Sequence, residues 1–212
     1  MNSMTTGLRD GEPKKRGIEP MKQRKSRQKA DRAPPGRAID RLDDPVVLID
    51  AKGKPAGTAG KLAAHQRGLR HQAISVIIRN KAGHILLQRR HLEKYLCGGE
   101  WTNACCSHPR PGERAATAAR RRLREEMGIS VPLKLLFQTE YRASVSADLV
   151  EHEVVDVFAG TFDGAPHPDP DEVADWCWIS PDALRIDMRH NARRYTPWFR
   201  TYVDKHWAQL GA

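Results

Sequence analysis

The residues best suited to chemistry lie between positions 101 and 128. Residues 101–109 read WTNACCSHP and place Cys106 two residues before His108. A cysteine can act as an acid or a base, and histidine is a common ligand of divalent metals. The segment that follows, residues 113–127, is rich in Glu and Arg and therefore suits binding of a metal ion and of phosphate groups. Together these features indicate an enzyme that moves a proton on a substrate held by its diphosphate.

The Glu- and Arg-rich segment resembles the Nudix box, a spaced pattern of Gly, Glu, Arg and paired Glu whose carboxylates bind Mg²⁺ and, through it, diphosphate oxygens. Aligned on the closing glycine, the matching residues are Glu113, Arg121, Leu123, Glu125, Glu126, Gly128 and Ile129. Two positions depart from the pattern, because Ser107 replaces a glycine and Arg122 replaces a glutamate. A cation in place of that carboxylate argues against a hydrolytic metal site.

Further candidate metal ligands lie outside this segment. His65 and His71 precede it, and Glu151 and Glu153 alternate in an expected strand, where residues two apart point to the same face. With His108 they make three histidines and two carboxylates, a set that can satisfy one divalent ion with nitrogen and oxygen ligands. Spacing alone leaves open whether these side chains converge.

From about residue 44 to 207 the chain resembles the type 1 isopentenyl-diphosphate Δ-isomerases, members of the Nudix superfamily. The segment at 100–109 (EWTNACCSHP) is the most specific part of the match. The other matching segments are 60–65 (GKLAAH), 69–71 (LRH), 89–90 (RR), 141–143 (YRA), 151–153 (EHE) and 196–198 (TPW). One loop departs from the family pattern, because residues 97–100 (CGGE) stand where an aromatic residue, Pro, Gly and Val are usual.

The resemblance implies an isomerase that interconverts isopentenyl and dimethylallyl diphosphate, and it implies the catalytic residues. Cys106 matches the catalytic cysteine, whereas its neighbour Cys105 does not have the required spacing to His108. Glu153, supported by Tyr141, matches the acid that protonates the terminal alkene carbon. On the other side of the substrate, Cys106 would take a proton from C2.

The resemblance also implies the binding residues. The metal ligands would be His65, His71, His108, Glu151 and Glu153, around one ion of Mn²⁺, Zn²⁺ or Mg²⁺. Glu126 would hold a Mg²⁺ that bridges to the diphosphate, and Trp198 would face the carbocation. The diphosphate itself would be bound by Lys61, Arg90, Lys94 and Arg122. Arg122 thereby explains the broken Nudix box as the gain of a phosphate-binding cation.

Two other functions fit parts of the sequence. A Nudix pyrophosphohydrolase would use the same helix, but hydrolysis needs a carboxylate where this chain has Arg122. A basic binding module with a structural zinc site would use the basic tail together with Cys105, Cys106 and His108. Adjacent cysteines cannot easily bind one tetrahedral ion, and a second ligand pair at zinc-finger spacing is missing.

Charge is concentrated at the beginning of the chain. Residues 1–38 hold 11 basic and 4 acidic side chains, a net charge of +7, whereas the remaining 174 residues hold 25 and 22, a net charge of +3. Few aromatic or β-branched residues occur before residue 42, so we expect a disordered basic tail over 1–42 and a Nudix-type isomerase domain over 43–212. Such a tail is expected to be a solvated extension, with no nucleic-acid partner.

The sequence also bounds the cellular setting. We find no apolar run of about 18 residues and no secretory signal, which predicts a protein without a membrane span. The four cysteines, Cys97, Cys105, Cys106 and Cys177, lack the spacing of a disulfide framework, which indicates reduced thiols. We therefore expect a cytoplasmic monomer whose partner is a small prenyl diphosphate.

Periodicity and turn residues predict the elements that position these side chains. We expect an α+β fold, a Nudix-type mixed sheet flanked by helices. Helices are expected at 113–127, ended by Gly128, and after Ser180 and Thr196, with one helical turn at 61–65. A structured loop with one strand is expected at 91–112. Strands are expected at 45–50, 72–79, 84–90, 133–142, 152–162 and 175–179, the second and third forming a hairpin.

Overall fold

The computed structural model describes residues 42–210. Apart from Leu42, the predicted basic tail over 1–42 lies outside the described residues. Within them, no helix combines the length and the apolar character needed to cross a membrane.

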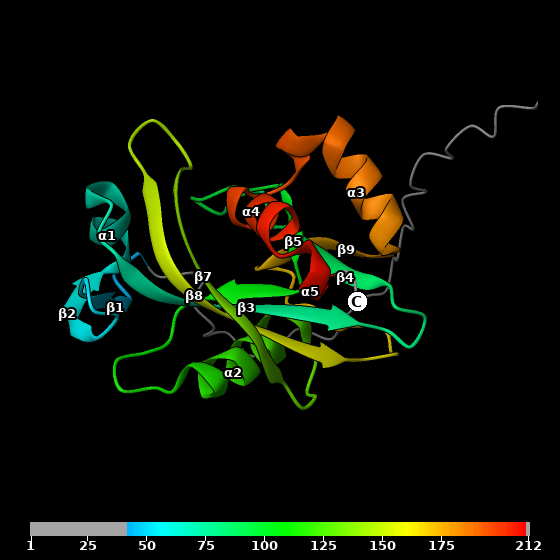
Figure 1. Ribbon diagram of the computed structural model, residues 1–212, viewed down its shortest axis with the longest axis horizontal. Helices are drawn as coiled ribbons and strands as arrows, with labels where there is room; N and C mark the ends of the chain where they lie inside the picture. The colour runs from blue at the N-terminus through cyan, green and yellow to red at the C-terminus, as the bar shows by residue number, and fades with distance from the viewer. Residues whose placement is uncertain (1–41, 211–212) are drawn as a thin grey trace, which may run out of the picture. The chain divides into compact units, whose positions relative to one another are not determined.

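Within residues 42–210, a mixed sheet of nine strands is built around β3 (His71–Arg79). Figure 1 shows how the strands are arranged. β3 runs parallel to β8 (Val150–Thr161) along its whole length and antiparallel to its other partners. Its β-branched residues are buried on both faces, which is typical of a strand in the middle of a covered sheet. The other strands are β1 (Pro45–Ile49), β2 (Pro55–Gly60), β4 (Ile85–Arg90), β5 (Trp101–Asn103), β6 (Cys105–Ser107), β7 (Lys134–Ser144) and β9 (Val173–Ile179).

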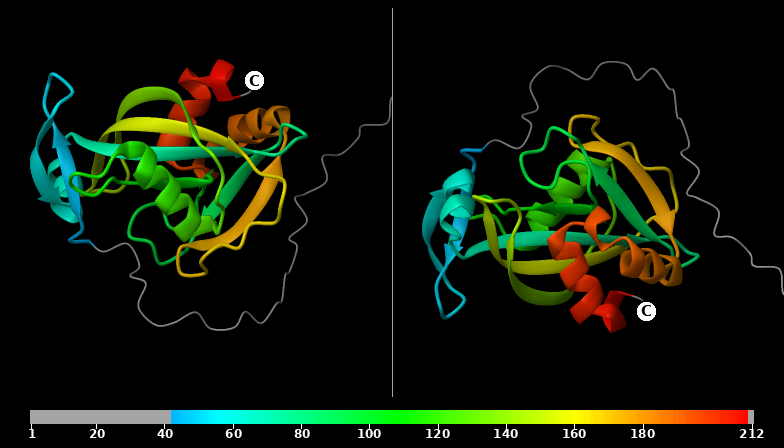
Figure 2. Two further views of the ribbon diagram at one scale, coloured as in Figure 1. Left: turned by 90° about the horizontal axis from the view of Figure 1, so that it is seen from below. Right: turned by 90° about the horizontal axis from the view of Figure 1, so that it is seen from above.

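Helices cover both faces of the sheet, in agreement with the predicted α+β fold (Figures 1 and 2). Helix α2 (Ala115–Met127) packs on one face through Ala118, Ala119, Leu123 and Met127. Helices α3 (Pro181–His190) and α4 (Pro197–Lys205) pack on the other face. The shorter elements are α1 (Lys61–Arg67), a 3₁₀ turn (Ala192–Arg194) and α5 (Trp207–Leu210). The sheet therefore separates two apolar cores.

Two predicted helix ends are confirmed by the backbone. The Ser180 hydroxyl accepts a hydrogen bond from the Ala183 amide and caps α3, with Pro181 in the first turn. Gly128 ends α2 at a φ of 66°, in the left-handed region. A Cβ at Gly128 would lie 2.6 Å from the backbone oxygen of His167, so glycine is required there by space as well as by conformation.

Other expectations were wrong in detail. The predicted hairpin is confined to its base, because β3 and β4 pair at Arg79 and Ile85 and β4 then pairs with β5 and β9. Strand β2, whose sequence PAGTAG has Thr58 as its one usual β-former, was not expected. The loop at 91–112 contains two short strands instead of one, and α2 begins at Ala115, so Glu113 precedes the helix.

Candidate active site

Strand register places several candidate side chains in one row. His71 on β3 is the direct partner of Glu153 on β8, which in turn is the partner of Tyr141 on β7. Side chains that are direct partners in neighbouring strands lie side by side on one face. Ala73 and Ile77 lie on the same face of β3 as His71, because residues two apart in a strand point to the same side. Both belong to the core beneath α3 and α4, so this row lies on the face that those helices cover.

The same register separates the two adjacent cysteines. β6 pairs with β3 so that Cys106 is opposite Ser75 and Cys105 is opposite Val76. Cys106 faces the side of the sheet that carries His71 and Glu153. Cys105 is fully buried in the core beneath α2. Since neighbouring residues in a strand point to opposite faces, one of the two thiols can reach the site.

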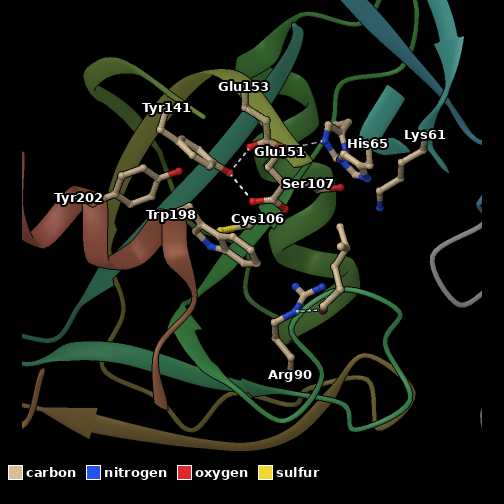
Figure 3. Close-up of a pocket in the computed structure, with 12 residues that line it drawn as sticks. Lys61, His65, Arg90, Cys106, Ser107, Tyr141, Glu151, Glu153, Trp198 and Tyr202 are labelled. Atoms are coloured by element: carbon tan, nitrogen blue, oxygen red, sulfur yellow. Dashed lines mark hydrogen bonds and ion pairs between the residues drawn. The ribbon is translucent and has the colours of Figure 1, made fainter. Parts of the chain in front are cut away.

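These side chains line a pocket of about 390 Å³, open mouth included (Figure 3). Its wall combines cations, carboxylates, histidines, one thiol and the aromatic rings of Tyr141, Trp198 and Tyr202. The lining residues are Lys61, His65, Arg90, Leu96, Cys106, Ser107, His108, Tyr141, Glu151, Glu153, Trp198 and Tyr202. Segments from across the sequence thus converge on one cavity, and most of the residues singled out from the sequence contribute to it.

Four of the five proposed metal ligands converge. The ligand atoms of His65, His71, His108 and Glu153 all lie within 4.8 Å of one another. Within 42–210, Nε2 of His65 and Nε2 of His71 are buried and have no hydrogen-bond partner. Buried ring nitrogens of this kind, beside a carboxylate, are suited to bind a divalent cation.

The outer nitrogens of two of these rings are already engaged. His65 Nδ1 lies 2.9 Å from the Tyr95 hydroxyl, and His71 Nδ1 lies 2.7 Å from the Leu69 carbonyl oxygen. Such contacts fix the orientation of metal-binding imidazoles and direct the other nitrogen inward. Burial, with a smaller contribution from the charge of His108, lowers the pKa of His65 to about 3, so this ring is neutral and able to act as a ligand. These observations fit a divalent metal.

Glu151 lies outside that four-residue cluster. As Figure 3 shows, Tyr141 stands between the two carboxylates, and its hydroxyl lies 2.9 Å from Glu151 Oε2 and 2.7 Å from Glu153 Oε2. Burial and the charge of Glu153 raise the pKa of Glu151 to about 8. Burial has the same effect on Glu153, but the hydrogen bond with His108 and the nearby ring of His71 outweigh it and hold its pKa well below the usual range. The two carboxylates therefore differ in proton affinity.

The two oxygens of Glu153 face different partners. Oε1 lies 3.0 Å from His108 Nε2 and 3.5 Å from His71 Nε2, on the side of the histidine cluster. Oε2 faces the Tyr141 hydroxyl. A single carboxylate can thus join the metal ligands through one oxygen and exchange a proton through the other.

The thiol of Cys106 is held between two polar side chains. Its Sγ lies 3.0 Å from Ser75 Oγ and 3.1 Å from Asn103 Oδ1. Burial raises the pKa of Cys106 to about 12, although the hydrogen bonds with Ser75 and Asn103 oppose the shift. The protonated thiol is therefore the favoured form in this structure.

The predicted substrate-binding residues divide into two groups. Lys61, Arg90 and Trp198 line the pocket. The Trp198 indole donates a 2.8 Å hydrogen bond to the Thr102 hydroxyl, and the Arg90 guanidinium lies 5.3 Å from its ring centre, which together fix the ring. Lys94 lies outside the lining of the pocket, as does Arg122.

A buried carboxylate that the sequence analysis missed joins the second group. Glu172 accepts hydrogen bonds from Lys94 and from Arg122, the latter at 3.2 Å. Arg122 also lies 2.7 Å from Glu126, whose other oxygen accepts from Gln88 Nε2 at 3.0 Å. Glu126 therefore stands apart from the histidine cluster, in a network of cations and carboxylates at the end of α2. In the sequence, Glu172 directly precedes the apolar start of β9 and belongs to no motif that would have predicted this role.

We expect Glu172→Ala to lower the free energy of unfolding by about 3 kcal/mol, because it removes the carboxylate from a buried pair with Lys94. Urea denaturation measures the change. Glu140→Ala is the matched control: Glu140 pairs with Arg70 at the surface, where such a pair contributes less than about 1 kcal/mol. Equal losses in the two variants would contradict the structural importance of Glu172.

Comparison with known proteins gives matches over the folded part of the chain. A family model for the NUDIX domain matches residues 69–199. The chain is 46% identical over 164 residues to isopentenyl-diphosphate Delta-isomerase 2 of Aromatoleum aromaticum, covering 77% of this chain and 87% of that protein. It is 49% identical over 149 residues to an isopentenyl-diphosphate Delta-isomerase of Rhodobacter capsulatus, with 69% and 84% covered. A Serratia proteamaculans protein of the same name is 39% identical over 178 residues, with 81% and 99% covered.

Solved structures share the architecture at lower identity. A MutT protein from Methanosarcina mazei superposes with a TM-score of 0.55 at 18% identity, covering 68% of this chain and 96% of that chain. A MutT NUDIX hydrolase from Burkholderia pseudomallei gives a TM-score of 0.52 at 21% identity, with 65% and 98% covered. At these identities the likeness shows the fold alone.

Proposed function

The chain belongs to the Nudix family and, within it, to the isopentenyl-diphosphate Delta-isomerases, and we propose that Cys106 and Glu153 transfer the two protons of its reaction. It is an isomerase that interconverts isopentenyl diphosphate and dimethylallyl diphosphate in isoprenoid biosynthesis. The observation that carries the residue assignment is that Cys106 and the Tyr141–Glu153 pair open into one pocket, although they come from three strands.

The proposed reaction moves one proton onto the substrate and one off it. Glu153, through Oε2 and the Tyr141 hydroxyl, delivers a proton to the terminal CH₂ carbon and leaves a tertiary cation at C3. Cys106 then accepts a proton from C2, and the electrons of that C–H bond form the new double bond. The enzyme thus begins with a thiolate and a protonated acid and ends with a thiol and a carboxylate. The structure favours the second state, from which the reverse reaction starts.

The rest of the pocket serves the cation and the diphosphate. The electron-rich face of Trp198 can stabilise a cation without trapping it, as a carboxylate would. Lys61 and Arg90 are placed in the wall of the pocket and can bind diphosphate oxygens. Burial of the reacting groups excludes water, which would otherwise capture the cation as an alcohol. We include Lys94 and Arg122 in the diphosphate site because Arg122 contacts Glu126, where a Mg²⁺ would bind.

The histidine and glutamate cluster indicates divalent metal binding. We propose that His65, His71, His108 and Glu153 hold one ion of Mn²⁺, Zn²⁺ or Mg²⁺, with Glu151 as a further ligand, and that Glu126 holds a Mg²⁺ shared with the diphosphate. A bound cation makes nearby acids stronger and would assist protonation of an alkene, which is a very weak base. The burial of Glu126 beside the Arg122 guanidinium supports a role in diphosphate binding over one in hydrolysis.

The arrangement of the site also supports proposals about the whole protein. We propose that residues 43–212 form the isomerase domain and that it acts as a monomer, because one copy of the chain supplies the cations, carboxylates, thiol and aromatic rings around a single pocket. Cys106 has to stay reduced to exchange a proton, which supports a cytoplasmic location.

The purified chain of residues 1–212 is expected to convert isopentenyl diphosphate to dimethylallyl diphosphate in the presence of Mg²⁺, without releasing phosphate. Product separation by chromatography and a parallel phosphate assay measure both outcomes. Release of phosphate without the isomer would instead identify a pyrophosphohydrolase and would contradict the proposed roles.

Removal of divalent metal is expected to lower turnover by at least about a hundredfold, because the three imidazoles and Glu153 would lose the ion that organises them. The measurement is the isomerisation rate after treatment with a chelator and after separate additions of Mn²⁺, Zn²⁺ and Mg²⁺. His65→Ala is expected to reduce the bound metal determined by elemental analysis. Full activity in metal-free protein would contradict the proposal.

A further inference from the structure

Two buried hydroxyls lie behind the sulfur of Cys106. Ser75 Oγ is 3.0 Å from Cys106 Sγ and 3.1 Å from the hydroxyl of Tyr202. Both residues are fully buried, Ser75 in the middle of β3 and Tyr202 one turn after Trp198 on α4. Ser75 interrupts an otherwise apolar run of residues 73–78 (AISVII). Burying a hydroxyl costs free energy unless it is hydrogen-bonded, so the contact with sulfur and Tyr202 accounts for a polar residue at this place.

On the other side of the sulfur, the contacts of Asn103 determine which atom donates in its hydrogen bond with Cys106. Its Nδ2 donates to the carbonyl oxygens of Val76, at 3.0 Å, and Cys105, at 2.9 Å. Its Oδ1 therefore faces the Thr102 hydroxyl and Cys106 Sγ, both at 3.1 Å. An amide oxygen can only accept hydrogen bonds, so at this contact Cys106 is the donor. Asn103 holds the sulfur in place without donating to it.

The hydroxyls of Ser75 and Tyr202 provide the opposite kind of contact, in which the Cys106 sulfur accepts a hydrogen bond. Tyr202 can donate to Ser75 Oγ, and the Ser75 hydrogen is then directed at Cys106 Sγ. We propose that Ser75 and Tyr202 are positioning residues for Cys106, forming a hydrogen-bond relay that holds its sulfur toward the pocket and donates to it. This inference rests on the proposed role of Cys106 as the group that accepts the proton from C2. The relay would link α4, which also carries Trp198, to the catalytic thiol through Tyr202 and Ser75.

The test removes one oxygen at a time, with Ser75→Ala and Tyr202→Phe. We expect Ser75→Ala to lower kcat about tenfold, the effect of losing one hydrogen bond to a charged group, and Tyr202→Phe to lower it severalfold. KM should stay within about twofold in both, because neither residue is assigned to the diphosphate. The rate of Cys106 alkylation by iodoacetamide at fixed pH, followed by mass spectrometry, should fall together with kcat in both variants. In a relay, adding Tyr202→Phe to Ser75→Ala should change nothing further.

Tyr195→Phe is the matched control, because Tyr195 is a buried tyrosine whose hydroxyl donates to Asp187 outside the pocket. It should leave kcat and alkylation unchanged. The proposal is overturned if Tyr202→Phe behaves like this control, or if the effects of Ser75→Ala and Tyr202→Phe simply add. Alkylation is measured without substrate, so it tests the relay even if the wild-type chain fails to isomerise isopentenyl diphosphate, a result that would refute the proposed function instead. Thermal unfolding of each variant verifies that it is folded.

Discussion

Replacing Cys106 with alanine is expected to lower kcat by about a thousandfold or more, because the variant lacks the group that takes the proton from C2. The substitution removes one sulfur from the wall of the pocket and leaves Lys61 and Arg90, the proposed diphosphate ligands there, in place, so KM for isopentenyl diphosphate should change little. The measurement is the rate of dimethylallyl diphosphate formation with saturating Mg²⁺.

Cys105→Ala provides the matched control, since it removes the same atom from the adjacent residue. Cys105 lies in the core on the other face of the sheet, where loss of a sulfur costs some stability but removes no group from the pocket. We expect this variant to keep most of its turnover. Comparable losses in the two cysteine variants, or full activity in Cys106→Ala, would refute the assigned roles.

Glu153→Gln is expected to lower kcat by roughly ten-thousandfold, because the amide keeps the size of the side chain and loses its acid function. The same change places an amide beside His71 and His108, so metal affinity should fall as well. Elemental analysis of the purified variant separates the two effects. Loss of turnover in protein that still contains its metal would assign the acid role directly.

The control for this change is Glu140→Gln on β7. Glu140 precedes Tyr141 and points to the opposite face, where it pairs with Arg70 and His152 at the surface. Turnover should remain within about twofold of the wild-type value. If Glu153→Gln were as active as this control, the proton would have to reach the alkene from another group, with Glu151 the nearest candidate through Tyr141.

Local chemistry in the sequence was enough to predict much of the fold. Periodicity and turn residues correctly predicted α2, its end at Gly128, the cap at Ser180 and the run of buried strands, because each depends on residues close in the chain. The predicted hairpin is present at its base but does not extend further, for the opposite reason. β4 leaves β3 after one pair and joins β5 and β9, and pairing between distant strands is decided by packing on both faces of the sheet.

The sequence by itself determined which kinds of side chain this protein has for its chemistry and, through the spacing of WTNACCSHP and the altered Nudix box, the family to which it belongs. Tertiary structure decided which of them meet. Register across β7, β8, β3 and β6 puts Tyr141, Glu153, His71 and Cys106 on one face and Cys105 on the other. The tertiary structure also leaves Glu151 outside the histidine cluster. It places Ser75, Tyr202 and Glu172 in hydrogen-bond networks with the predicted site residues, although no sequence motif predicted them. The physical reason is that a side chain's neighbours across a sheet are set by the pairing of strands that are far apart in the sequence. The spacing of residues along the chain does not determine that pairing.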